Sequence, residues 1–312
     1  MQRRYYSMKL VTVLAVLCLF LLPNCSSNKS KQKQNNESME DFLSEDEIFD
    51  DIDKAKKIFY SLPSPLETAM LIKSAGAEYN ETLLNPVSNS GNYSSNKAMA
   101  LNLGIYTTDL SFASLFDQTQ TSIKYMEAAR KMAEGLDITD AINDETIKRL
   151  EDNLNNRDVI MDIISETFLE SSSYLKENDR PAVATIVLIG GWIEGLYIAT
   201  ELVDGNSIQG NKLVDRIAEQ KLSFRIVQRM LSDNLKDQSG EENQDIAELI
   251  EELKPLKASF DKIKVETSEI RVEPDENTKV AMLRSQTKIS ITPEAFNELR
   301  QTVDNLRTNF VQ

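Results

Sequence analysis

The sequence predicts an all-α protein, a multi-helix bundle or an array of helical hairpins with eight or nine helices and room for one short β-hairpin near the C-terminus. Three observations support this fold class. Apolar residues recur every three or four positions from residue 41 onward, which is the spacing of amphipathic helices. Glycine and proline are sparse, at 10 and 8 of 312 residues, and several prolines stand where helices would begin. The apolar share of 41% fits a compact chain.

We expect the helices to follow one another along the whole body of the chain. Their predicted ranges are about 48–62, 65–76, 96–116, 119–134, 143–176, 181–203, 213–230 and 246–260, with a last helix from Pro293 onward. The range 143–176 is either one helix or two joined near Asn155 and Asn156. Ser64 and Thr292 each precede a proline and a glutamate, which is typical of a capped helix start. Pro255 is expected to kink its helix.

The region between the last two helices has a different pattern. Residues 270–272 and 288–291 alternate apolar and polar side chains with the period of a β-strand. We expect these two segments to pair as a short hairpin.

Residues 1–24 are typical of a secretory signal. Arg3, Arg4 and Lys9 form a basic start, and Leu10 to Leu22 is an uncharged run of 13 residues. A membrane-spanning helix needs about 20 apolar residues, so this run is too short for a stable span.

A cysteine follows this run directly, in the sequence LPNCSS at residues 22–27. The sequence resembles the lipobox of bacterial lipoproteins, whose cysteine is acylated and becomes the new N-terminus. Asn24 stands where that pattern has Gly, Ala or Ser. The alternative is an ordinary signal cleaved elsewhere, but no small-residue cleavage site is present. The resemblance implies that Cys25 is lipidated, and Cys18, the other cysteine, would leave with the signal.

The predicted organisation is a lipoprotein signal at 1–24, a lipidated cysteine with a disordered tether at 25–40, and a single helical domain at 41–312. The tether is rich in Ser, Asn, Gln and Lys and has too little apolar surface to fold. Loss of the signal leaves 32 basic and 50 acidic residues, a net charge of −18. We therefore expect membrane attachment through the lipid rather than through a basic surface.

The composition narrows the function classes. The chain has no histidine, which excludes Ser-His-Asp and Cys-His catalysis and imidazole metal ligands. The formal net charge is −15, and an acidic surface argues against nucleic-acid binding. We expect no cofactor, no metal site and no nucleic-acid partner, and an enzyme is the weaker expectation.

Two predicted helices carry acidic residues within apolar sequence. Asp109 lies in an apolar helix, and Glu194 lies in the most apolar segment of the body, residues 182–203, which we expect to be a buried core helix. If these helices pack together, the two carboxylates could form a pocket for a cationic or sugar-like ligand. The candidate pocket residues are Tyr106, Asp109, Trp192, Glu194 and Tyr197. The alternative is that each carboxylate pairs with an arginine such as Arg130, Arg216 or Arg225 and fixes helix packing.

The chain also contains a weak internal similarity. A shift of 86 residues places Tyr106 and Leu110 on Trp192 and Leu196. A duplicated helical hairpin would explain this match, and chance similarity between helical sequences is the alternative.

In overall plan the chain is similar to the uncharacterised all-helical lipoproteins of the Bacteroidota. The shared features are the LPNCSS sequence, the polar tether and a helical body that opens with YSLPSP at residues 60–65. The lipoproteins that reach the cell surface usually carry acidic residues after the cysteine, and residues 26–29 lack them. The resemblance therefore implies a protein on the inner leaflet of the outer membrane, facing the periplasm. It transfers no catalytic residue.

The sequence thus predicts a lipid-anchored envelope protein that acts as a non-enzymatic binding or scaffolding module with a protein partner. The alternatives are a small-ligand receptor that uses the acidic and aromatic pocket, and a carboxylate-based hydrolase.

Overall fold

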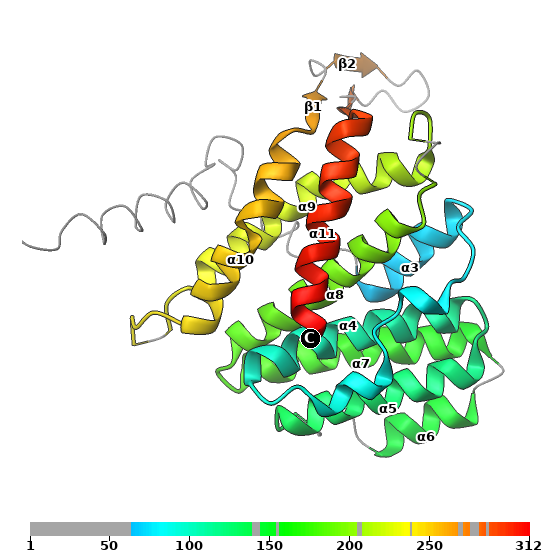
Figure 1. The fold of residues 1–312 in the computed structure, drawn as a ribbon, viewed down its shortest axis with the longest axis vertical. Coiled ribbons are helices and arrows are strands. Elements are labelled where there is room, and N and C mark those ends of the chain that lie inside the picture. Colours follow the sequence, from blue (N-terminus) through cyan, green and yellow to red (C-terminus); the bar gives the residue numbers. More distant parts are fainter. Residues whose placement is uncertain are drawn as a thin grey trace, which may run out of the picture. The chain divides into compact units, whose positions relative to one another are not determined.

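The structure is a computed structural model that describes residues 64–312, with gaps at 139–143, 154–155, 205–207, 238, 268–270, 275–280 and 285–286. The chain divides into a unit of residues 1–38, which lies outside the described residues, and a unit of residues 39–312. The signal, the tether and the helix expected at 48–62 therefore lie outside the described part. Figure 1 shows that the described part is built mainly from helices, as the sequence predicts.

The helices follow the predicted order closely. Their bounds are α3 Pro65–Ser74, α4 Asn96–Leu115, α5 Thr119–Gly135, α6 Asp144–Asp152, α7 Arg157–Glu177, α8 Pro181–Glu201, α9 Lys212–Asn234, α10 Gln244–Asp261 and α11 Pro293–Val311. Two short 3₁₀ helices, η2 Glu81–Leu83 and η3 Val87–Gly91, connect α3 to α4.

Local capping explains several of the helix starts. Ser64 accepts a hydrogen bond from the Glu67 amide at 3.2 Å, and the Glu67 carboxylate accepts one from the Ser64 amide at 2.7 Å. This reciprocal pair confirms the predicted capping box. Thr292 caps α11 with a single bond, because its side chain accepts from the Ala295 amide at 3.2 Å. The predicted start signals therefore act where the sequence places them.

Proline and asparagine have different effects on the long helices. The segment 143–176 is two helices, because α6 ends at Asp152 and Asn156 caps the start of α7. Helix α10 continues through Pro255. Proline has no amide hydrogen, so one intrahelical bond is missing at this point.

Four short strands precede α11. Strand β1 Lys264–Thr267 pairs antiparallel with β4 Thr287–Ser290, and β2 Arg271–Pro274 pairs antiparallel with β3 Ala281–Arg284. The expected pairing of residues 270–272 with 288–291 is therefore wrong. Arg271 lies opposite Arg284, and Lys288 lies opposite Glu266. Alternation alone specifies which residues share a face and does not specify the partner strand.

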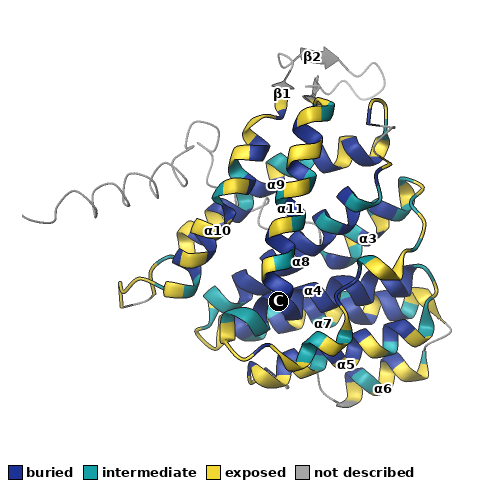
Figure 2. Ribbon diagram, viewed as in Figure 1, coloured by how far each residue is buried: buried dark blue, intermediate teal, exposed yellow. Residues whose placement is uncertain are grey.

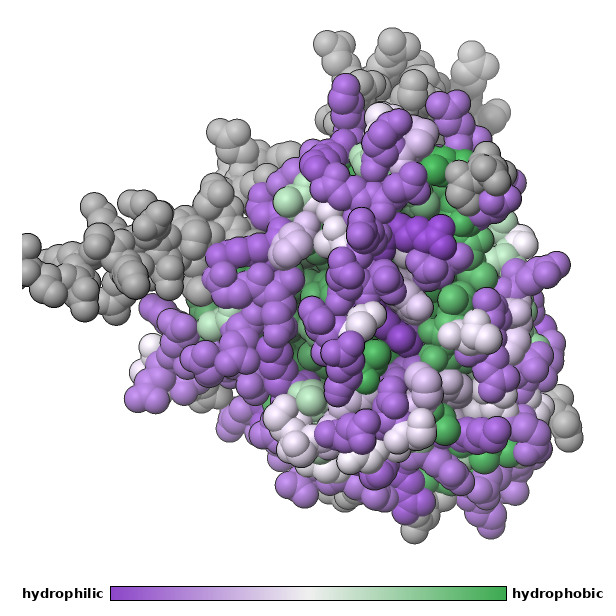
Figure 3. All heavy atoms as spheres, viewed as in Figure 1, coloured by the Kyte–Doolittle hydropathy of each residue, from purple (hydrophilic) through white to green (hydrophobic). Residues whose placement is uncertain are grey.

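The core is organised around α4 and α8. Every residue from Ala100 to Leu115 is buried, and α8 is buried from Ala184 to Thr200 except at Leu188 and Tyr197. Figure 2 shows both helices mainly in the buried colour, whereas α5, α6 and α10 expose one side. On the face seen in Figure 3, hydrophilic side chains cover most of the surface. Helix α8 is long and apolar enough to cross a membrane, but 78% of its most apolar 18-residue stretch is buried within the protein. The predicted buried core helix is confirmed.

Glycines allow α4 and α8 to approach at backbone distance. A Cβ atom on Gly104 would collide with the Val187 carbonyl, and one on Gly190 would collide with the Leu101 carbonyl. A shift of 86 residues converts Gly104 into Gly190 and Leu101 into Val187, so it exchanges the two contacts. The helix pair therefore has an approximate two-fold relation with the same 86-residue offset as the sequence similarity.

Candidate functional site

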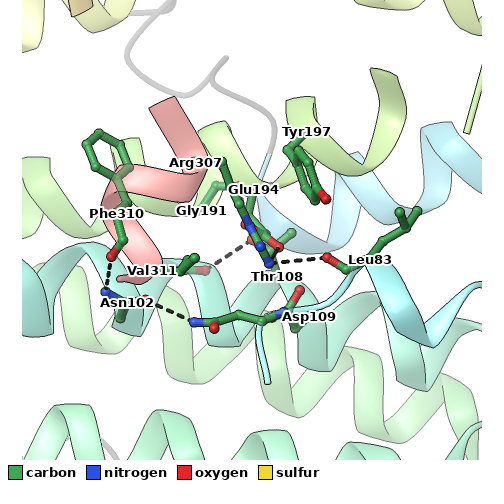
Figure 4. A network of polar contacts seen from close by, with 12 residues as sticks. Leu83, Asn102, Thr108, Asp109, Gly191, Glu194, Tyr197, Arg307, Phe310 and Val311 are labelled. Atoms are coloured by element: carbon green, nitrogen blue, oxygen red, sulfur yellow. Dashed lines mark hydrogen bonds and ion pairs between the residues drawn. The ribbon is translucent and has the colours of Figure 1, made fainter. Parts of the chain in front are cut away.

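The structure brings Asp109 and Glu194 together in the core. Asp109 lies on α4 and Glu194 on α8, and both residues are 0% exposed. Figure 4 shows the cluster between these helices and the end of α11. The close packing of α4 against α8 is what places the two carboxyl groups side by side.

An arginine from the last helix occupies the space beside the two acids. Arg307 Nε donates to Glu194 Oε2 at 3.0 Å, and a second guanidinium nitrogen donates to Glu194 Oε1 at 3.0 Å. The same nitrogen donates to the Leu83 carbonyl at 3.2 Å. Burial by itself would lower the pKa of Arg307, but the charge and hydrogen bonds of Glu194 outweigh it and raise the pKa. The two side chains therefore form a buried ion pair with two parallel hydrogen bonds.

Asp109 has fewer hydrogen-bond partners than Glu194. Its Oδ2 accepts from the Asn85 amide at 3.1 Å, and its Oδ1 is buried without a hydrogen-bond donor. Burial and the negative charge of Glu194 raise the pKa of Asp109 well above its ordinary value, and Arg307 opposes this only in part. A proton on Asp109 relieves the repulsion, because it gives Asp109 a donor toward Glu194. The raised pKa favours the protonated form of Asp109 beside the ion pair of Glu194 with Arg307.

Asparagine and tyrosine side chains connect this cluster to the C-terminal turn of α11. Asn85 Nδ2 donates to Tyr93 Oη and to Asn102 Oδ1, both at 3.0 Å. Asn102 Nδ2 donates to the Phe310 carbonyl at 2.8 Å, and Tyr93 Oη donates to the Val311 carbonyl at 3.1 Å. The last carbonyls of a helix have no partner within the helix, so these bonds satisfy them inside the core. The network thereby fastens α11 to α4.

The aromatic residues of the predicted pocket separate into two groups. Tyr197 lies over the Arg307 guanidinium, 4.6 Å from its ring centre to the guanidinium carbon. Tyr106 packs beside Tyr93 and donates to the Pro86 carbonyl at 3.2 Å. Trp192 instead donates to Gln220 at 2.9 Å and stacks with Phe224 and Phe260.

The structure therefore assembles only part of the predicted set. Asp109, Glu194 and Tyr197 meet around Arg307. Burial raises the pKa of Tyr106, and the charge of Asp109 adds to this effect. Trp192 belongs to the interface of α8 with α9 and α10. Trp192 and Glu194 are two positions apart on α8, and side chains with this spacing point to different sides of a helix.

The carboxylate pairs with an arginine other than those expected. Arg130 pairs with Glu134, and Arg216 pairs with Glu219, both on their own helices. The partner is Arg307, which the sequence reasoning missed. The sequence does contain an indication that Arg307 is buried. It shares a helix face with Val303, Phe310 and Val311, which are buried. A charged residue on the apolar face of a helix needs a buried counter-charge.

This arrangement leaves little room for a ligand or a metal ion. Arg307 already makes the bidentate bonds and the ring contact that a cationic ligand would make. In residues 64–312, outside the gaps, no group of three or more metal-binding side chains occurs. Cavities occur elsewhere. The roomiest of those described is about 160 Å³ and lies between the ends of α4, α5 and α7, lined by Ser114, Gln118, Ser122 and Arg157 among others.

Comparisons with known proteins give no further guide. No protein family, no curated protein and no solved structure matches this chain.

Proposed function

We propose that this protein is a lipid-anchored component of the cell envelope, whose helical body is a non-enzymatic binding or scaffolding module facing the periplasm. The observation that supports the non-enzymatic role of the helical body is the pairing of Arg307 with Glu194. This pairing fills the acidic and aromatic cluster with a side chain of the protein itself. The cluster therefore serves to fix the packing of α11, α8 and α4.

The two alternative functions both need access to the same carboxylates. A small-ligand receptor would use them to bind a cation, and a hydrolase would use them as acid and base. Both side chains are 0% exposed, and Glu194 has its two oxygens bonded to Arg307. These contacts favour the binding or scaffolding role, with a protein partner on the outer helices. For the finer architecture of the body we propose eight or nine helices and a short β-hairpin. In this arrangement the outer helices have a side that faces outward.

The anchor is proposed from the sequence at residues 1–27. Metabolic labelling with a fatty acid tests it. The wild-type protein should carry the label, and Cys25→Ala should lose both the label and membrane retention. Cys18→Ala is the matched control, because that cysteine lies inside the signal and should leave labelling unchanged. Equal membrane retention of all three proteins, with no label in any, would contradict the anchor.

The role of the body is tested separately. We expect affinity capture of the intact protein from a detergent-solubilised envelope to enrich the same envelope protein reproducibly. We expect no thermal shift with sugars, polyamines or divalent cations, because a ligand that binds the native state stabilises it. A saturable shift of several degrees that Glu194→Gln abolishes would instead establish the receptor function.

A further inference from the structure

The roomiest of the described cavities lies where α4, α5 and α7 meet, and it shares no residue with the cluster around Glu194 and Arg307. Its volume is about 160 Å³, whereas the cavity beside α3, α8 and α9 and the one among α4 to α8 are about 30 and 40 Å³. A cavity of this size that has polar partners holds several waters or one small polar ligand. The lining is mainly polar and consists of Ser114, Asp117, Gln118, Thr119, Ser122, Arg157 and Ile160.

The turn between α4 and α5 places Asp117 at this cavity. The Asp117 amide donates to the Ser114 carbonyl at 3.0 Å, and the Gln118 amide donates to the Ala113 carbonyl at 3.0 Å. These bonds end α4 and hold Asp117 at φ 59°, a left-handed conformation that aspartate adopts more readily than most residues. Helix α5 begins at Thr119, so the side chains of three consecutive residues of this turn line the cavity.

An arginine from α7 lies opposite Asp117. Arg157 is the first residue of α7, and its Nη1 atom is 3.7 Å from Asp117 Oδ2. Its Nε atom is 3.5 Å from Oδ1 of Asp158, a side chain that is 88% exposed. Charged hydrogen bonds of this kind are normally about 2.7–2.9 Å long. Among the residues that the structure describes, the side chains of Arg157 and Asp117 form these loose ion pairs and no hydrogen bond. A guanidinium and a carboxylate therefore line the cavity with hydrogen-bonding capacity to spare.

Neutral polar groups complete the lining. The Thr119 hydroxyl has no hydrogen bond within the described part of the chain. Gln118 Nε2 donates to the Phe116 carbonyl at 2.8 Å, which leaves the second N–H of this side-chain amide for another partner. Ser122 Oγ is already bonded, because it donates to the Gln118 carbonyl at 3.0 Å and accepts from Ser114 Oγ at 3.0 Å. The cavity therefore offers one cation, one anion and two uncharged hydrogen-bonding side chains.

The two charges restrict the class of ligand. Because Arg157 and Asp117 are 3.7 Å apart, a simple anion at Arg157 would be repelled by Asp117, and a simple cation at Asp117 would be repelled by Arg157. A ligand that carries both charges avoids this repulsion. In an α-amino acid a single carbon atom separates the carboxylate from the ammonium group, so the two groups can bind these neighbouring side chains at once. The volume of about 160 Å³ restricts the ligand to amino acids with a small side chain.

We propose that this cavity binds a small α-amino acid as a zwitterion. The carboxylate of the ligand binds the Arg157 guanidinium, whose planar fork matches it. The ammonium group binds the Asp117 carboxylate, and Thr119 and Gln118 bind the remaining polar atoms. Bound in this way, the ligand joins the turn between α4 and α5 to the start of α7. This inference goes beyond the proposed function and does not depend on it.

Calorimetric titration of the full-length protein with glycine and with L-serine tests the proposal. We expect a dissociation constant of about 1 mM or tighter for at least one of them. Acetate and methylammonium each carry one of the two charges, and neither should bind at the same concentrations. Arg157→Gln and Asp117→Asn should each weaken amino-acid binding at least about tenfold, because each removes a charged hydrogen-bonding partner. Arg216→Gln is the matched control, because Arg216 is an exposed arginine that pairs with Glu219, and it should leave binding unchanged.

Loss of binding in these variants has to be separated from loss of the fold. The side chains of Arg157 and Asp117 are 42% and 68% exposed, so both variants should keep the wild-type melting temperature to within a few degrees. Thr119→Leu provides a test without any change of charge. It narrows the cavity and removes a hydroxyl, so it should also weaken amino-acid binding.

Three results would overturn the proposal. The first is the absence of binding of either amino acid up to about 10 mM in the wild-type protein. The second is acetate that binds as tightly as glycine and binds still more tightly to Asp117→Asn, which would make the cavity a site for simple anions. The third is equal weakening by Arg157→Gln and Arg216→Gln, which would show an effect of overall charge and no site at this cavity.

Discussion

Arg307 and Glu194 are 113 residues apart in the chain and form a buried ion pair with two hydrogen bonds of 3.0 Å. The pair joins the last helix, α11, to the most apolar helix, α8. Both side chains are removed from water, at 9% and 0% exposure. Asp109 lies against the same pair, and burial and the charge of Glu194 raise its pKa well above its ordinary value. A bonded polar cluster therefore lies inside a core that is otherwise mainly apolar.

Arg307→Met should lower the free energy of unfolding by about 3–5 kcal/mol, because it leaves Glu194 buried without its counter-charge. Urea denaturation followed by circular dichroism measures this loss. Arg216→Met is the matched control, because Arg216 pairs with Glu219 at an exposed site, and its loss should be below about 1 kcal/mol. Adding Glu194→Leu to Arg307→Met should recover part of the stability. Equal losses in the two single variants would contradict a special role for Arg307.

Asp109 should make stability depend on pH in the direction opposite to that of a salt-bridged carboxylate. A raised pKa means that the native protein binds this proton more tightly than the unfolded chain, in which Asp has its ordinary value of 3.8. The stabilisation from Asp109 is fully present below that value and is lost as the pH rises toward the native pKa. Asp109→Asn mimics the protonated acid, so it should remove this loss.

The measurement is the difference in unfolding free energy between Asp109→Asn and the wild type, from pH 4 to 9. The difference should change steadily in favour of the variant as the pH rises. A difference that stays constant across this range would show that Asp109 is ionised in the native protein.

Gly104→Ala should destabilise the protein strongly, because the added methyl group collides with the Val187 carbonyl in the backbone of α8. Overpacking of a core typically costs about 1–3 kcal/mol, and a backbone neighbour cannot rotate away. Gly135→Ala is the control within this fold. Its new methyl group meets the flexible end of the Met99 side chain, so a smaller loss is expected. Thermal unfolding of both variants compares the two, and an equal loss would show that α4 and α8 can move apart easily.

Tyr93→Phe should cost about 1–3 kcal/mol, because it leaves a buried Asn85 donor without its acceptor and removes a donor to the Val311 carbonyl. Hydrogen exchange should then be faster in the last turn of α11 than in α10. Unchanged exchange in α11 would mean that Asn102 and Asn89, which donate to the Phe310 and Val311 carbonyls, suffice to hold the C-terminal turn.

The sequence by itself determined the all-α class, the helix starts and the burial of α8. These features depend on residues within one or two turns of each other, such as Ser64 with Glu67, or the uninterrupted apolar run in α8. Side-chain spacing and capping act over that distance, so they can be read from the chain.

Only the tertiary structure decided which helices meet and which groups pair. The contact of Gly104 with α8, the pairing of β1 with β4, and the choice of Arg307 as the partner of Glu194 all join distant residues. The sequence showed that a carboxylate in α8 needs a counter-charge, but several arginines satisfied that need equally well. The selection follows from packing, because the close approach of α4 to α8 buries Glu194 on the side where α11 lies, and Arg307 of α11 bonds to it there.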